Sequence, residues 1–106
     1  MIRAGELRHR VTIQQKSVTR NTFGEEIVTW QDVATVWAAI EPLRGREFFE
    51  SQQVNAEVTT RIRIRYRPGI TPTMRVVYGS RIFDIQAVIN VEERNRELHL
   101  MCREEV

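Results

Sequence analysis

Residues 61–67 read Arg61-Ile62-Arg63-Ile64-Arg65-Tyr66-Arg67, a run in which every second residue is an arginine. Successive side chains of a β-strand point to opposite faces of the sheet, so this alternation predicts a strand with one apolar and one cationic face. The residues expected to face a core are Val58, Thr60, Ile62, Ile64 and Tyr66, and those expected to face away are Glu57, Thr59 and the arginines.

The outward row of guanidinium groups is the first candidate for function, because such groups pair with carboxylates and phosphates. Three interpretations remain open. The row can face solvent with cross-strand partners such as Glu97, it can meet the carboxylates of a neighbouring subunit, or it can contact DNA phosphates. Because Tyr66 is expected to face inward, no platform for stacking single-stranded bases is predicted. The candidate residues are Arg61, Arg63, Arg65 and Arg67.

The 106 residues correspond to one domain, which we place at residues 1–106. A hydrophobic content of 42% fits a folded protein, and a net charge of +2 excludes a general polycation. Every basic residue except Lys16 is arginine, which fits either an interface or a codon bias. Cys102 is the only cysteine, so no internal disulfide forms. With a charged N-terminus and no apolar run near the roughly 20 residues of a membrane helix, we expect a soluble cytosolic protein.

The first half of the chain predicts two strands. Leu7, His9, Val11 and Ile13 alternate with polar residues, and the region Arg20–Gly24 reads as a turn. A second strand begins near Ile27, pauses at Asp32 and resumes over Val36–Ile40. This last piece is apolar on both faces, so the face that carries Trp37 must meet a helix, a loop or another chain.

The second half predicts further short strands. Pro68-Gly69 ends the arginine strand, and Gly79-Ser80 is a signal for a two-residue hairpin turn. We expect one strand to place Phe83, Ile85, Ala87, Ile89 and Val91 on one face, and the last strand to place Leu98, Leu100 and Cys102 together. Six short strands without a strong helical pattern predict a small antiparallel sandwich or barrel.

The segment Leu43–Ala56 fits neither the strand nor the helix period cleanly. We expect an arm with one or two helical turns. Its Phe48 and Phe49 either fold back over the sheet or reach a neighbouring protomer or a central opening. An irregular connection of this length is long for a small domain, and such connections are commonly functional.

Catalytic chemistry finds little support in the sequence. His9 lies on the apolar side of its predicted strand, which favours a core histidine. His99 and Cys102 are three residues apart on a strand and therefore point to opposite faces, which argues against a shared metal. No nucleophile motif or phosphate-binding loop is present. We expect no enzymatic activity, no metal site and no cofactor.

The run from Ala34 to Phe49 resembles the phage head–tail joining family, the small adaptor or head-closure proteins of tailed phages and prophages. The stretch reads Ala34-Thr35-Val36-Trp37-Ala38-Ala39-Ile40-Glu41-Pro42-Leu43-Arg44-Gly45-Arg46-Glu47-Phe48-Phe49. Further agreement comes from Gly5–Gln14, Ile64-Arg65-Tyr66, and Phe83-Asp84-Ile85 leading to Arg96-Glu97-Leu98. The resemblance covers nearly the whole chain.

This resemblance implies a mainly β fold, a six-stranded antiparallel barrel with a long loop or short helix between strands two and three. It also implies a structural virion protein, in a dodecameric ring below the portal that joins the tail and holds or passes double-stranded DNA. Assembly would take place in the host bacterial cytoplasm. The candidate arm or gate residues are Arg44, Arg46, Glu47, Phe48, Phe49 and Glu50, and the candidate subunit-interface or DNA-facing residues are Trp37, Arg61, Arg63, Arg65 and Arg67. A free nucleic-acid-binding barrel and a tail-completion ring protein remain as alternatives.

Overall fold

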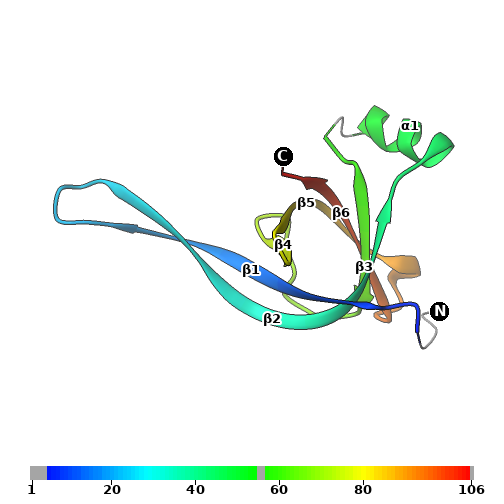
Figure 1. Cartoon of the computed structure of the whole chain (residues 1–106), viewed down its shortest axis with the longest axis horizontal. Coiled ribbons are helices and arrows are strands. Elements are labelled where there is room, and N and C mark those ends of the chain that lie inside the picture. Colours follow the sequence, from blue (N-terminus) through cyan, green and yellow to red (C-terminus); the bar gives the residue numbers. More distant parts are fainter. Residues whose placement is uncertain (1–4, 55–56, 106) are drawn as a thin grey trace.

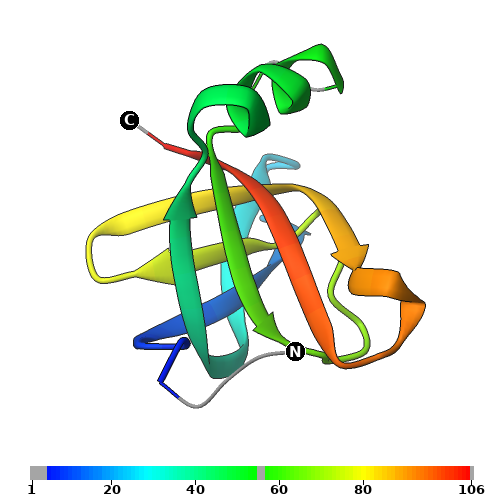
Figure 2. The same ribbon diagram turned by 90° about the vertical axis from the view of Figure 1, so that its right-hand side faces the viewer.

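A computed structural model describes residues 5–54 and 57–105, which form six strands and one short α-helix. The strands are β1 (His9–Arg20), β2 (Glu26–Pro42), β3 (Thr60–Arg65), β4 (Arg75–Tyr78), β5 (Arg81–Asn90) and β6 (Glu97–Glu104). All neighbours pair antiparallel in the order β1-β2-β3-β6-β5-β4, and β4 pairs with β1, so the sheet is a closed barrel. Figure 2 shows how the sheet curves round on itself. The expected six-stranded antiparallel architecture is confirmed.

The inside of the closed sheet is the hydrophobic core. Ile62 and Ile64 of β3 are 0% and 1% exposed, and Thr60 and Val58 are also buried, as the arginine alternation predicts. Tyr66 does not join them. It lies beyond the end of β3 with 38% of its surface exposed, so the expectation that it faces the core is wrong. The alternation no longer fixes its side because the strand has already ended.

A bulge in β5 changes which of its residues face the core. Ile85 pairs with Cys102 and Ala87 pairs with Met101, so Gln86 is an extra residue of β5 with no residue opposite it in the register of β6. An extra residue in one strand shifts the alternation beyond it. Val88 therefore packs against the core and Ile89 is 47% exposed. The expectation that Ala87 and Ile89 share the core face with Phe83 is wrong, whereas Phe83 itself is fully buried.

The β1–β2 hairpin extends well beyond the closed sheet (Figure 1). We expected a first strand that ends near residue 14 and a second strand that pauses at Asp32. Instead β1 continues to Arg20, and β2 is continuous from Glu26. Ile13 pairs with Ala34 and Gln14 with Asp32, so the irregularity at this point is a bulge formed by Val33. From the Gln15–Gln31 pair to the tip, the two strands pair only with each other.

The helix α1 (Gly45–Val54) and the 3-10 turn η1 (Val91–Glu93) complete the structure. α1 connects β2 to β3, which confirms the expected arm with helical turns, although the end of the arm at residues 55–56 lies outside the described residues. In both ribbon views α1 stands at one end of the closed sheet and covers neither of its faces. Within the described residues, no helix has the length and hydropathy needed to span a membrane.

Candidate interaction surfaces

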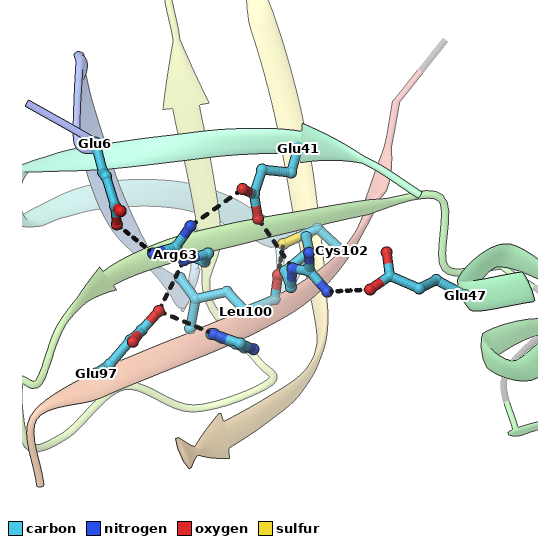
Figure 3. Close-up of polar contacts among 9 residues, drawn as sticks. Glu6, Glu41, Glu47, Arg63, Glu97, Leu100 and Cys102 are labelled. Atoms are coloured by element: carbon cyan, nitrogen blue, oxygen red, sulfur yellow. Dashed lines mark hydrogen bonds and ion pairs between the residues drawn. The ribbon is translucent and has the colours of Figure 1, made fainter. Parts of the chain in front are cut away.

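Arg63 is the centre of an ion-pair network on the outer face of β2, β3 and β6 (Figure 3). Its Nε donates to Glu97 at 2.7 Å, its Nη1 donates to Glu41 at 3.1 Å, and its Nη2 donates to Glu6 at 2.8 Å. The Arg63 side chain is only 18% exposed, so most of it is removed from solvent. Three carboxylates of the same chain thus hold one arginine of the predicted row.

Arg61 connects the closed sheet to α1. Its Nε donates to Glu41 of β2 at 3.0 Å, and its Nη1 donates to Glu47 in the first turn of α1 at 3.1 Å. A second link runs from Gln52, whose side-chain amide donates to the carbonyl of Val58 at 2.7 Å. The orientation of α1 therefore depends on polar links at its two ends.

The network shifts the pKa values of its members. Hydrogen bonds, first from Arg63 to Glu97 and then to Glu6 and Glu41, outweigh burial and raise the pKa of Arg63 above its ordinary value. Burial opposes ionisation of Glu97, but hydrogen bonds from Arg63 and His99 outweigh it and lower the Glu97 pKa. The Glu97 carboxylate is only 10% exposed. The first half of the arginine row is thus neutralised within the chain.

The second half of the row differs. Arg65 and Arg67 are exposed, and no carboxylate among the described residues pairs with either. Arg65 lies beside Trp37, which is 51% exposed and has the guanidinium of Arg10 stacked on its ring at 5.2 Å. These residues surround an open hollow of about 290 Å³, here called the Trp37 hollow. Its lining includes Leu7, Val36, Trp37, Tyr66, Arg65 and Arg67.

The candidate arm residues lie on or beside α1 and are mostly exposed. Arg44 precedes the helix, and Arg46 forms a 3.8 Å ion pair with Glu50 one turn later. Phe49 is 68% exposed and packs edge-to-face against Phe48, with 5.9 Å between ring centroids. The exposed Phe49 shows that the arm does not simply bury its aromatic residues against the sheet.

Sequence reasoning missed the tip of the β1–β2 hairpin (residues 20–26). Phe23 at this tip is 87% exposed. A signal for the hairpin was present: the paired residues lie at equal distances on either side of residue 23 and have complementary character. Arg20 pairs with Glu26, Val18 with Val28, and Gln14 with Asp32.

Residues with catalytic potential are engaged in structural contacts. His9 forms a hydrogen bond of 3.0 Å between its Nδ1 and the Tyr78 hydroxyl, and His99 contacts Glu97 at 3.0 Å. Cys102 is fully buried, and burial raises the pKa of its thiol, so the thiolate is disfavoured. The described residues contain no cluster of three or more His, Cys, Asp or Glu that would suit a metal ion.

Comparison with known proteins identifies related chains. The model of a family described as phage head completion protein matches residues 2–105. The solution structure of protein SF1141 from Shigella flexneri 2a has a TM-score of 0.75 and 30% sequence identity, covering 99% of this chain and 98% of that chain. A chain in the virion of a native gene transfer agent particle has a TM-score of 0.63 and 23% identity, covering 94% and 96% respectively, and shares the fold. A comparison with curated proteins gave no match.

Proposed function

The chain belongs to the family of phage head completion proteins, and we propose that it acts as a ring below the portal, at the point where the tail joins the head. It is a structural protein of the virion. In this proposal the closed sheet is the rigid body of each subunit, and α1 is directed at the DNA channel or at the adjoining ring. Its partners are further copies of the chain, the portal or adaptor ring, the tail proteins and the packaged double-stranded DNA.

The observation that carries this proposal is the position of α1. The helix stands off the closed sheet, and polar links from Arg61 and Gln52 tie it there. Exposed hydrogen bonds and ion pairs contribute roughly 0.5–1.5 kcal/mol each, so such links can be exchanged for contacts with a partner at little cost. A helix held this way can take one position in the free subunit and another in the assembled ring.

The surface chemistry of the arm supports a role in holding or releasing a closure. Arg44, Arg46 and Glu50 present charges of both signs, and Phe49 presents an apolar group. Mixed charges suit pairing between adjacent arms better than binding to a polyanion, because carboxylates repel phosphates. The arms of neighbouring subunits are therefore proposed to contact each other across the channel when the head is closed.

Deletion of residues 46–53 from a phage that carries this gene tests the proposal. The closed sheet should stay folded, because no described side chain of α1 belongs to its hydrophobic core. Heads should leak DNA or fail to join tails. Normal infectivity of the deletion phage would overturn the role of the arm.

A matched control separates loss of the arm from loss of its links. The double substitution Glu47→Ala and Gln52→Ala removes the two links but keeps the helix and its other exposed residues. If the arm acts in the assembled ring, this variant should retain most of its infectivity while the deletion does not. Equal loss of infectivity in both variants would mean that infectivity depends on the links that hold the helix in the free subunit, and not on contacts of the arm in the assembled ring.

A further inference from the structure

We propose that the hairpin tip of one copy docks into the Trp37 hollow of a second copy. This inference rests on the proposed ring and names the residues of one contact between its subunits. In this contact, the part of the hairpin that extends beyond the closed sheet meets the surface around Arg65 and Arg67, the exposed part of the arginine row.

The hairpin tip is built to present Phe23. The side-chain oxygen of Asn21 accepts hydrogen bonds from the backbone N–H groups of Phe23 at 2.9 Å and Glu25 at 3.0 Å. The Asn21 backbone also pairs with Glu25 at 3.0 Å, and Gly24 supplies the positive φ of +80° that the turn requires. A fixed turn lowers the entropy that is lost when its aromatic residue is immobilised in a partner.

The Trp37 hollow offers a matching surface. Apolar groups of Leu7, Val36, Trp37 and Tyr66 line it, and at about 290 Å³ it can receive an aromatic ring. Half-exposed aromatic residues surrounded by arginine are typical of the energetically dominant positions in protein interfaces. An aromatic ring that enters the hollow would contact the Trp37 side chain and exclude water from it.

The charges of the two surfaces are complementary. Among the described residues, no carboxylate pairs with Arg10, Arg65 or Arg67, which surround the hollow. The tip carries Glu25 and Glu26 close to Phe23, and both are exposed. Glu26 also forms an exposed ion pair with Arg20 at 3.6 Å, so the tip has two carboxylates and one guanidinium. Docking brings these carboxylates to arginines that have no carboxylate partner in the described chain, which favours this orientation over others.

The two surfaces lie far apart on one molecule, so each chain needs a second one. Leu7, close to the N-terminal end of the described chain, lines the hollow, whereas the hairpin tip lies at the opposite end of the longest axis (Figure 1). The molecule extends 49 Å along this axis. A contact between two different surfaces is head-to-tail and generates a ring when its rotation closes.

DNA suits the hollow less well than a protein tip does. The three carboxylates of Glu6, Glu41 and Glu97 on the same outer face outnumber the two arginines that pair with them, Arg61 and Arg63, so this face does not attract phosphates. The net charge of +2 also gives little general attraction to a nucleic acid. An apolar hollow with three arginines fits an aromatic residue that two acidic residues follow closely in the chain.

A mixture of two complementary variants tests the contact by NMR. ¹⁵N-labelled Phe23→Ala protein keeps the hollow, and unlabelled Trp37→Ala protein keeps the tip, so only one contact can form. The chain has two indole groups, and Trp30 already has the Arg75 guanidinium stacked on its ring at 4.0 Å. The Trp37 indole signal should shift saturably, while the Trp30 signal should not. Unlabelled protein with both substitutions is the matched control and should cause no shift.

A charge reversal makes the test specific. Glu25→Lys with Glu26→Lys in the unlabelled partner should weaken binding by about tenfold or more. Arg65→Glu with Arg67→Glu in the labelled partner should restore it.

No Trp37 shift with about 1 mM of each variant would overturn the proposal, since even millimolar affinity is detectable there. Equal shifts from the control, or saturation by a 12-base-pair DNA duplex instead of the tip, would also overturn it. The α1 deletion does not touch this contact, so the two proposals can fail separately.

Discussion

The two halves of the β1–β2 pair show how differently one strand pair behaves inside and outside a closed sheet. In the inner half, residues 9–14 and 34–42, β1 also pairs with β4 and β2 also pairs with β3. In the outer half, residues 15–20 and 26–33, each strand pairs only with the other. The inner half has a core beneath it. The outer half is mostly exposed on both faces, apart from Trp30, on which the Arg75 guanidinium stacks.

Closure of the sheet, more than the sequence of either strand, determines this difference. Ile13 is fully buried, whereas Val18, five residues further along the same strand, is 51% exposed and faces Val28. A two-stranded ribbon alone is marginally stable in water and exposes edges that can pair with other chains. An apolar residue retained in such a ribbon therefore suggests a partner outside the subunit.

The largest predicted effect compares Ile13→Ala with Val18→Ala. The first substitution leaves a cavity in the core and should lower the free energy of unfolding by about 2–5 kcal/mol. The second removes part of an exposed cross-strand pair and should cost under about 1 kcal/mol. Urea unfolding of both variants measures the difference. Similar losses in the two variants would mean that the hairpin is packed in solution by contacts that one subunit lacks.

The second prediction compares two arginines of the row on β3, one held by carboxylates of the same chain and one exposed. Arg63→Gln leaves three carboxylates, including the nearly buried Glu97, without their shared cation, and should cost about 1–3 kcal/mol of stability. Arg65→Gln removes no ion pair and no side-chain hydrogen bond within the described residues and should change stability by under about 0.5 kcal/mol. Thermal unfolding compares the two. For the contact between subunits we expect the opposite order. Arg65→Gln should weaken it more than Arg63→Gln, because Arg65 borders the proposed docking site and Arg63 does not.

A smaller effect concerns acid stability through Glu97. Its pKa in the folded state lies below its ordinary value of about 4.3, so the unfolded state binds more protons between these two values. Stability from this group is complete above the ordinary carboxyl pKa and is lost as pH falls through the folded pKa. The difference in urea midpoint between wild type and Glu97→Gln should therefore narrow from pH 7 to pH 3. Glu104→Gln is the control, because the Arg81–Glu104 pair is more exposed and should show a weaker trend. A difference that stays constant with pH would show that Glu97 acts through packing alone.

The sequence predicted β3 well because nothing interrupts its alternation. Its apolar residues face the core, and its arginines face outward, with Glu97 as a partner across the sheet as expected. The remaining partners, Glu6, Glu41 and Glu47, could not be predicted, since they come from three other parts of the chain. Their positions depend on the register of β2 and on the start of α1.

Bulges explain the errors in β2 and β5. A single extra residue, Gln86 in β5 or Val33 in β2, reverses the alternation beyond it and leaves no clear signal in composition. The interaction surfaces could also be predicted only in part. Trp37 was identified because its strand is apolar on both faces, but Phe23 was assigned to an ordinary turn.

The last prediction concerns the bulge at Val33, which lies where the hairpin leaves the closed sheet. Deletion of Val33 lets Ala34 and Asp32 become neighbours, and both keep their present partners, Ile13 and Gln14, on their present faces. Val33 is 36% exposed, so its loss removes little core, and stability should change by less than about 1 kcal/mol. Because a bulge bends and twists its strand, the hairpin should instead change direction, which residual dipolar couplings of its amide groups can measure.

If the direction of the hairpin matters for assembly, this variant should fold normally and carry an intact tip but fail to form the ring. Assembly at wild-type levels with a redirected hairpin would show that the outer half of β1–β2 is flexible at this joint and that the bulge does not set the geometry of contact.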